Sequence, residues 1–212
     1  MSRRKSPAIS ARKAPSQERS NQLVSAILEA AVRVLEREGA IRFTTARVAE
    51  TAGVSVGSLY QYFPNKEAIL FRLQTDEWKQ TGSLLNHILS DKQLSAANRV
   101  RTVVREFFRS ECDEANLRAA LSDAAPMYRH APETAEHHRE GTARMASFVK
   151  ELLPDASASQ RRVAVDVFMT TISAVGKSIS TQQRSRTEVN TLASAIAEML
   201  IAYFDQVREA SK

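Results

Sequence analysis

The sequence predicts an all-α protein, and three observations support this. Only six of its 212 residues are glycine and six are proline, whereas helix-favouring residues are abundant. Apolar residues recur at spacings of three and four, and no useful run of alternating β-branched residues occurs. The apolar content of 43% and charged content of 25% are typical of a soluble globular protein that buries a sizeable core. We expect about nine helices in two domains, an N-terminal three-helix domain and a C-terminal helical domain.

Residues 1–18 are predicted to be a basic arm. Six basic residues stand against the single acidic Glu18 in residues 1–19, so this stretch carries +5 of the net charge of +6. Pro7, Pro15 and the lack of a large apolar set predict no fixed structure for the isolated arm. Such an arm strengthens nucleic-acid binding by neutralising phosphates, or it is a solvated tail without a role.

A first amphipathic helix is predicted over residues 18–38, ended by Gly39. Ile41 and Phe43 are expected to close the gap between this helix and the next one. The apolar face of the helix consists of Leu23, Val24, Ile27, Leu28, Ala31, Val34 and Leu35.

Residues 44–63 have the pattern of a helix-turn-helix, with short helices near 45–52 and 56–62. Gly53 lies where the first helix must end, and glycine adopts the left-handed conformation of that position without steric cost. Ser55 lies where the second helix needs an N-cap, and Thr44 and Thr45 are equally suitable caps for the first. The second helix buries Leu59 and Phe63 and is expected to leave mostly small or hydrogen-bonding residues outward: Val56, Gly57, Ser58, Gln61 and Tyr62, with Tyr60 at the edge.

A long helix is predicted to follow, from Lys66 to about Leu89, because Pro64-Asn65 stops the preceding helix and Asn65 can cap the next one. It would be the only covalent connection through which a distant event moves the helix-turn-helix. Its apolar positions are Ile69, Leu70, Leu73, Leu84, Leu85, Ile88 and Leu89.

The rest of the chain shows helical patterning without recognisable chemistry. Further helices are predicted over residues 94–112, 117–125, 132–153, 159–183 and 188–208. Pro132 stands at a helix start, where proline is tolerated. The last helix is striped by Val189, Leu192, Ile196, Leu200, Phe204 and Val207.

The run TTARVAETAGVSVGSLYQYFPNKEAIL, which begins at Thr44, resembles the DNA-binding signature of the TetR/AcrR transcriptional regulators. The resemblance covers roughly the first eighty residues. It implies a helix-turn-helix DNA-binding domain over residues 19–80 and an effector-binding and dimerisation domain over residues 81–212. Helices 159–183 and 188–208 resemble the family's dimerisation pair, which forms a four-helix bundle in a homodimer. The alternative interpretation is an internal core pair in a monomer.

The resemblance also assigns roles within the helix-turn-helix. The implied base-facing residues are Val56, Gly57, Ser58, Gln61 and Tyr62. The implied phosphate contacts, which fix register rather than read sequence, are Thr45, Arg47, Ser55, Tyr60 and Lys66. For Tyr60 and Tyr62, the alternative to DNA contact is aromatic packing on the core of the small domain. Ala46 departs from the family pattern, in which a long polar side chain at this position can read a base.

An effector pocket is implied by the family and has no sequence motif. Aromatic and sulfur-bearing residues on the central helices suit a cavity for a small apolar or aromatic effector, although each one also suits a plain core. These candidates are Trp78, Phe107, Cys112, Met127, Tyr128, Met145 and Phe148.

Other classes of function find little support. The single cysteine excludes an intrachain disulfide framework and a multi-cysteine zinc site, and no apolar run approaches the ~18 residues of a membrane span. The acidic and histidine cluster around His137 is interpreted as a solvated face, so no metal and no cofactor are expected. No phosphate-binding glycine loop or catalytic motif occurs, so no catalytic residues and no enzyme activity are expected.

The sequence therefore predicts a cytoplasmic, homodimeric regulator that binds a pseudo-palindromic operator in double-stranded DNA and does not associate with membranes. Release of a repressor by a small-molecule effector is the mode that the resemblance implies. The alternatives are a helix-turn-helix regulator controlled by a protein partner and, less favoured, a helical enzyme. The sequence does not exclude activation.

Overall fold

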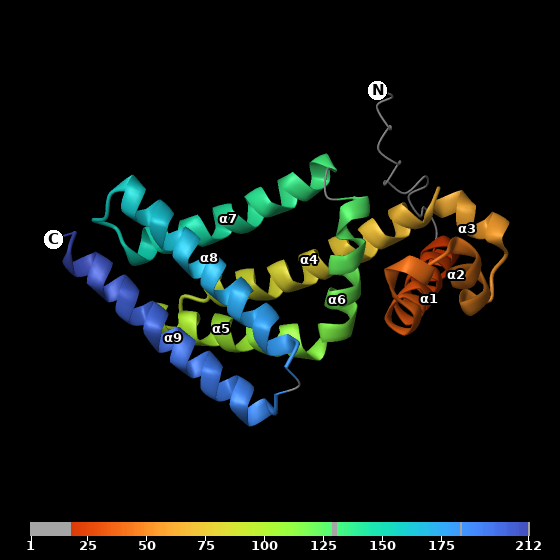
Figure 1. The fold of residues 1–212 in the computed structure, drawn as a ribbon. Coiled ribbons are helices and arrows are strands. Elements are labelled where there is room, and N and C mark those ends of the chain that lie inside the picture. The colour runs from red at the N-terminus through yellow and green to blue at the C-terminus, as the bar shows by residue number, and fades with distance from the viewer. Residues whose placement is uncertain (1–17, 129–130, 183, 212) are drawn as a thin grey trace, which may run out of the picture. The chain divides into compact units, whose positions relative to one another are not determined.

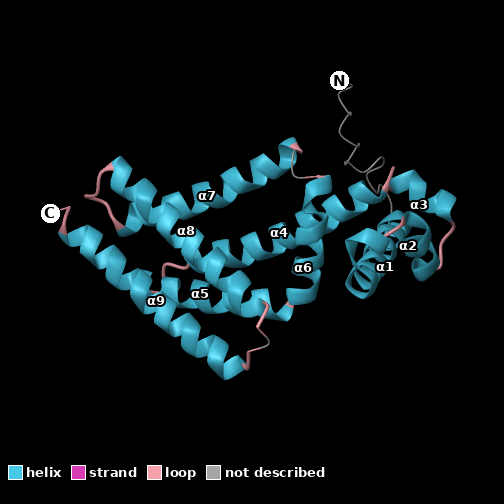
Figure 2. Ribbon diagram, in the orientation of Figure 1, coloured by secondary structure: helices cyan, strands magenta, loops and turns pink. Residues whose placement is uncertain are grey.

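The computed structural model describes residues 18–128, 131–182 and 184–211. Within these ranges the chain forms nine α-helices and one short 3-10 helix, with no strand (Figures 1 and 2). The predicted all-α class is thus confirmed. In chain order the elements are α1 (Glu18–Arg42), α2 (Thr45–Ala52), α3 (Val56–Tyr62), α4 (Lys66–Ser90), α5 (Ala96–Asp113), α6 (Ala115–Ala124), η1 (Ala125–Met127), α7 (Pro132–Leu152), α8 (Ala158–Ser180) and α9 (Arg186–Glu209).

Local sequence signals set the helix ends. Gly39 has φ 71° and interrupts the helical backbone of α1, as a glycine can without steric cost. Thr44 and Ser55 are the N-caps of α2 and α3, and the Asn65 side chain accepts a 2.8 Å hydrogen bond from the Ala68 N–H at the start of α4. The predicted basic arm, residues 1–18, lies outside the described residues except for Glu18.

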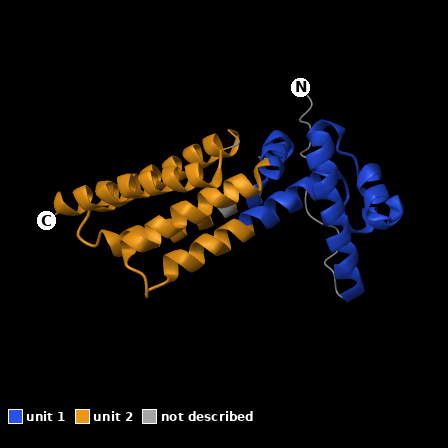
Figure 3. Cartoon of the chain, turned by 90° about the horizontal axis from the view of Figure 1, so that it is seen from below, with its two compact units in different colours: residues 1–78, 116–134 blue, residues 79–115, 135–212 orange. Residues whose placement is uncertain are grey.

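The chain divides into two compact units (Figure 3). Unit 1 contains the described residues of 1–78 and 116–134, and unit 2 contains residues 79–115 and those described from 135 onward. Helix α4 begins in unit 1 and ends in unit 2. The structure differs from the predicted 81–212 domain because residues 116–134 belong to the same compact unit as the helix-turn-helix.

The core of unit 1 explains why residues 116–134 belong to it. Leu121 and Tyr128 are buried in the same apolar cluster as Phe43 and Leu59. The Tyr128 hydroxyl lies 2.9 Å from the Leu121 carbonyl oxygen and 3.1 Å from Oε1 of Gln74 on α4. Burial of the hydroxyl, reinforced by the nearby charge of Glu77, raises the pKa of Tyr128. Apolar burial and buried hydrogen bonds thus both tie α6 and η1 to the first half of α4.

An ion pair adds to this connection within unit 1. Nη2 of Arg118 on α6 lies 2.9 Å from Oε1 of Glu77 on α4, and the two side chains are only 13% and 9% exposed. Removing one partner of such a buried pair leaves an uncompensated charge.

Two predicted core positions are instead exposed. Phe43 is fully buried as expected, but Ile41 is 93% exposed, so the prediction that it closes the gap beside α1 was wrong. The backbone turn at Gly39 directs Ala40 into the core and leaves Ile41 outside. Leu84 on α4 is also partly exposed, at 39%.

Unit 2 has its own core, in which α5 packs against α8 and α9. Phe108, Phe168 and Phe204 are fully or almost fully buried in it. Helix α8 approaches α5 closely at Gly176, where a Cβ atom would lie 2.9 Å from the Phe107 ring and 3.0 Å from Cγ of Glu111. Glycine is therefore required for this approach unless the side chains on α5 move.

A charged residue is buried in the same unit. The Arg99 side chain is 4% exposed; Nη1 donates a 2.8 Å hydrogen bond to the Leu89 carbonyl oxygen and Nη2 donates a 2.6 Å bond to Oε1 of Glu151 on α7. Its guanidinium lies 5.0 Å from the ring centroid of Phe148, within cation–π distance. Lys92 is a second cationic partner of Glu151.

Unfolding of the protein by acid is expected to depend on Glu151. Hydrogen bonds from Arg99 and then Lys92 lower the pKa of Glu151 from 4.5 to about 2. The ionised carboxylate therefore stabilises the fold above pH 4.5, and this contribution is lost as the pH falls towards 2. Glu151→Gln should flatten the dependence of the unfolding free energy on pH in this window, measured by urea denaturation. An unchanged slope would contradict the assigned ion pair.

Within the part of the chain that the structure describes, one helix, α8, is long and apolar enough to cross a membrane by length and composition, whereas no such run was predicted from the sequence. Core helices of soluble proteins satisfy the same criterion. Phe168 and Ile172 of α8 are buried in the core of unit 2.

Candidate DNA-binding site

The turn between α2 and α3 has the geometry that the sequence predicts. Gly53 adopts the left-handed conformation, with φ 68° and ψ 28°, and its N–H donates a 3.1 Å hydrogen bond to the Glu50 carbonyl oxygen. The next N–H, that of Val54, donates a 3.0 Å bond to the Ala49 carbonyl oxygen. Two of the orphan carbonyls at the end of α2 are thus satisfied, and the chain turns directly into α3.

Helix α3 presents a small, uncharged outer face. Leu59 and Phe63 anchor the helix in the core of unit 1, whereas Gly57 and Gln61 are exposed and Val56 is 40% exposed. A face of small side chains allows a helix backbone to approach base edges closely in a major groove. The structure thus places three of the predicted base-facing residues on one accessible surface.

The other two predicted base-facing residues are positioned differently. Tyr62 is only 5% exposed and its hydroxyl donates a 3.2 Å hydrogen bond to the Ser20 hydroxyl on α1, so the prediction that it points outward was wrong. Tyr62 follows Leu59 by three residues and therefore shares its buried face. Ser58 is half-buried, and its hydroxyl lies 2.9 Å from that of Ser55.

The predicted phosphate contacts Thr45 and Tyr60 meet across the two helices. The Thr45 hydroxyl at the start of α2 lies 3.1 Å from the Tyr60 hydroxyl on α3. This contact holds the Tyr60 hydroxyl in place, while Tyr60 as a whole remains 40% exposed. Ser55, by contrast, accepts a 3.0 Å hydrogen bond from the Ser58 N–H as the N-cap of α3.

Arg47 is partly neutralised within the protein. Its guanidinium forms an ion pair with Glu38 and donates a 3.0 Å hydrogen bond to the Arg42 carbonyl oxygen, although its side chain remains 46% exposed. A hydrogen bond from Arg37 and the charge of Arg47 lower the pKa of Glu38. A phosphate contact by Arg47 would thus compete with Glu38, a competition that the sequence gives no means of foreseeing.

Lys66 stands at the first position of α4, where the helix N-terminus already favours an anion. Its side chain is half-buried. The predicted role as a phosphate contact is compatible with this position.

The seven predicted effector-pocket residues do not form one cluster. Trp78, Met127 and Tyr128 belong to the core of unit 1. The other four, Phe107, Cys112, Met145 and Phe148, belong to the core of unit 2. Cys112 also lines a surface pocket together with Val189 and four arginines, and the sequence predicted no site at these arginines.

The described residues contain no group of three or more His, Cys, Asp or Glu side chains that could hold a metal ion. The side chains of His137 and His138 are not among those described.

Two short helices joined by a left-handed glycine, with the second helix exposed along a small-residue face, define a helix-turn-helix DNA-binding protein. Comparison with known proteins gives the same class. Residues 27–73 match the model of the bacterial regulatory proteins of the tetR family, and residues 95–207, more than half of the chain, match the tetracyclin repressor-like C-terminal domain. The chain belongs to the TetR family of DNA-binding transcriptional regulators.

Individual relatives match only part of the chain. The nucleoid occlusion factor SlmA of Vibrio cholerae is 38% identical over 80 residues, which are 37% of this chain and 40% of the relative. The fatty acid metabolism regulator protein of Bacillus subtilis is 30% identical over 91 residues, 43% of this chain and 46% of the relative. The chain thus matches less than half the length of these relatives.

A solved structure extends the likeness of fold. The transcriptional regulator FadR from Bacillus subtilis, in complex with stearoyl-CoA, superposes with a TM-score of 0.62 at 19% identity. The match covers 84% of this chain and 97% of that one. At this identity the comparison shows a shared fold.

Proposed function

We propose that the protein is a homodimeric repressor that binds a pseudo-palindromic operator and is released from it by a small apolar effector. The observation that carries the proposal is the exposed face of α3, formed by Val56, Gly57 and Gln61 and held rigidly by the Gly53 turn and the Ser55 cap. Gln61 bonds an adenine edge and Val56 packs on a thymine methyl in this proposal. Thr45, Tyr60 and Lys66 contact phosphates and fix the register.

Dimerisation is assigned to α8 and α9. Val163 on α8 and Met199 on α9 are large apolar residues that are 48% and 51% exposed. Exposed small residues flank them, which permits close helix approach: Thr170, Ala174, Ala195 and Ala202. A second copy placed on this face would bury it and would present two helix-turn-helix units to the two half-sites of a symmetric operator.

Helix α4 provides the route from effector to DNA, because one continuous helix contributes residues 66–78 to unit 1 and residues 79–90 to unit 2. The effector binds more tightly to a conformer in which the two α3 helices no longer match half-sites spaced by ~34–36 Å. Effector binding then shifts the population away from the operator-bound form.

The relatives favour an acyl-type effector, since one is a fatty acid metabolism regulator and a protein of the same fold is a complex with stearoyl-CoA. Stearoyl-CoA is therefore the first probe to test on the full chain. A ligand at ~100 times its dissociation constant stabilises the fold by about 2.7 kcal/mol, which a thermal-shift assay detects. We expect the same concentration to release a labelled operator in fluorescence anisotropy.

The second candidate function is control by a protein partner, since one relative is named for nucleoid occlusion and not for a metabolite. A thermal-shift screen of a broad library of apolar and aromatic compounds distinguishes control by an effector from control by a protein partner. Stabilisation by a compound that also releases DNA supports the effector; a library without any stabilising compound favours the partner.

Sequence readout and phosphate contact are expected to respond differently to mutation. Gln61→Ala should cost ~1–3 kcal/mol on the preferred operator and change the base preference at one position. Lys66→Ala should weaken binding to all sequences alike and lower the slope of log affinity against log salt by about one. Anisotropy titrations at several salt concentrations check both. If Lys66→Ala changes neither affinity nor slope, its assignment as a phosphate contact is incorrect.

A further inference from the structure

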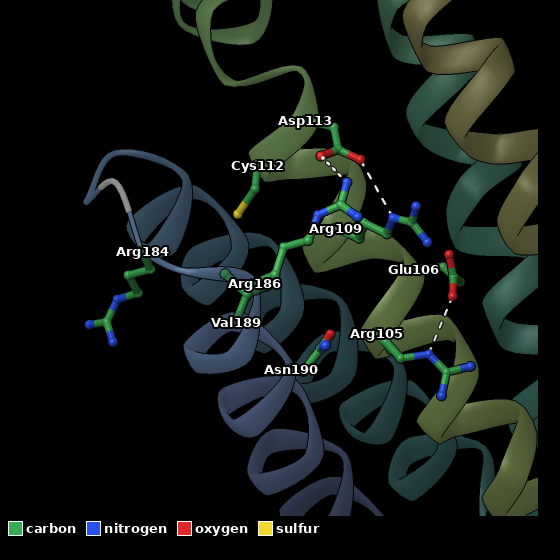
Figure 4. Close-up of a pocket in the computed structure, with 9 residues that line it drawn as sticks. All are labelled: Arg105, Glu106, Arg109, Cys112, Asp113, Arg184, Arg186, Val189 and Asn190. Carbon is green, nitrogen blue, oxygen red and sulfur yellow. Dashed lines mark hydrogen bonds and ion pairs between the residues drawn. The ribbon is translucent and has the colours of Figure 1, made fainter.

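Unit 2 contains an arginine-rich pocket of about 350 Å³ between the C-terminal half of α5 and the start of α9 (Figure 4). This volume is in the range of small-molecule sites. Its charged lining residues are Arg105, Glu106, Arg109, Asp113, Arg184 and Arg186. The remaining lining residues are Cys112, Val189 and Asn190, so Val189 is the only aliphatic one. The pocket is thus unsuited to the apolar effector proposed above.

The arginines of the pocket are incompletely neutralised. Among the residues that line the pocket, four guanidinium groups stand against two carboxylates. Glu188, which lies outside the lining and interacts with Arg184, reduces this excess of positive charge. Arg109 and Arg186 share Asp113, at N–O distances of 3.6 and 3.7 Å, which exceed those of a direct charge-assisted hydrogen bond. Figure 4 shows Arg186 reaching from α9 towards Asp113 on α5, between the two helices.

The other two arginines differ in their partners. Arg105 pairs with its neighbour Glu106 at 3.3 Å. Arg184 donates 2.6 and 3.0 Å hydrogen bonds to the neutral side-chain oxygen of Gln182 and extends away from the other three arginines. Hydrogen bonds from Ser185 and the charge of Arg184 lower the pKa of Glu188, so this carboxylate offsets part of the Arg184 charge. Burial, with the charges of Asp113 and Glu111, raises the pKa of the Cys112 thiol, so the thiol adds no negative charge at neutral pH.

We propose that this pocket binds a phosphate or pyrophosphate group, with Arg109 and Arg186 as its principal ligands. A phosphate monoester carries about −1.5 to −2 charges at neutral pH, opposite in sign to the excess of guanidinium groups in the lining. Guanidinium groups bind phosphate oxygens in bidentate fashion, and two of them already flank one shared anion, Asp113. The phosphate belongs either to the head group of the effector or to a separate phosphorylated metabolite.

Isothermal titration calorimetry of the full chain with inorganic pyrophosphate, in the absence of DNA, tests the site. The variant is Arg109→Gln/Arg186→Gln, whose side chains are 55% and 78% exposed, so the fold should persist. The matched control is Arg101→Gln/Arg139→Gln. It removes the same charge from exposed arginines of unit 2 that are paired elsewhere, with Glu198 and Glu136.

We expect saturable binding to the wild-type chain and to the control, and at least tenfold weaker binding to the Arg109/Arg186 variant. Coenzyme A is the second probe. Tighter binding than pyrophosphate, with the same dependence on these arginines, assigns the phosphate to an effector head group; equal or weaker binding assigns it to a separate metabolite. No saturable binding to the wild type, or equal weakening in both variants, overturns the proposal. Operator binding without added anion is measured separately, so failure of the pocket is distinguishable from failure of the proposed function.

Discussion

Replacing Gly57 by glutamate is expected to abolish sequence-specific DNA binding while leaving the fold intact. A Cβ atom at this position would lie 3.8 Å from the Ser55 hydroxyl oxygen, an ordinary contact, so the helix itself accepts a side chain. Replacement of glycine also favours the helix. On the DNA side, the longer, negatively charged side chain would hold α3 out of the groove and repel phosphates. Specific binding exceeds non-specific binding by ~10³–10⁷, so we expect operator affinity to fall at least about 100-fold.

Gly141→Glu on α7 is the matched control, because a Cβ atom there would meet nothing within 4 Å, so this helix also accepts a side chain, and the change of charge is identical. Anisotropy measures operator affinity, and thermal unfolding confirms the fold of both variants. Operator binding by Gly57→Glu at the level of Gly141→Glu would show that α3 does not enter the groove.

Arg99→Ala is expected to cause the largest loss of stability among the substitutions discussed. The change removes a buried guanidinium from its bonds to the Leu89 carbonyl and the Glu151 carboxylate and uncovers the ring of Phe148. Breaking a buried pair by removing one partner costs roughly 3–5 kcal/mol. Because Glu151 itself is 39% exposed and can be partly rehydrated, we expect about 2–3 kcal/mol.

Arg101→Ala is the comparison, since this arginine lies two residues further along α5 and pairs with Glu198 at the surface, where both side chains are largely exposed. An exposed pair contributes ~0–1 kcal/mol. Urea denaturation of the two variants gives both values. An Arg99→Ala variant no less stable than Arg101→Ala would show that the buried ion pair does not stabilise unit 2.

The helix-turn-helix could be predicted from sequence because its signals are local. The end of α2 depends on the backbone of Gly53, and the starts of α2, α3 and α4 depend on the side chains of Thr44, Ser55 and Asn65 within three residues. Capping is a property of a few adjacent residues and is visible without knowledge of the fold.

Positions that depend on distant partners were predicted less well. The Tyr62 hydroxyl donates a hydrogen bond to Ser20, which lies 42 residues away in the sequence. Because this bond satisfies the polar group, Tyr62 can lie in the core although it was predicted to be at the surface. Ile41 has an apolar side chain but follows a backbone turn that points it outward. Apolar character alone therefore did not determine burial at these two positions.

Charged residues were the hardest to place. Arg99 is buried because Glu151, 52 residues away, lies beside it, and the charge of Arg47 is shared with Glu38 on α1. The arginines of the unit 2 pocket come from α5 and from residues at the start of α9, which are far apart in sequence. Such clusters arise from tertiary packing and have no motif.

Selection of DNA fragments by the purified full chain from a randomised pool, followed by sedimentation of the complex, tests the central claim most directly. The account predicts a selected sequence with two inverted half-sites about one helical turn apart, bound by two copies of the chain. A chain that selects no common sequence at low ionic strength, or that binds its selected site as a single copy, would contradict it.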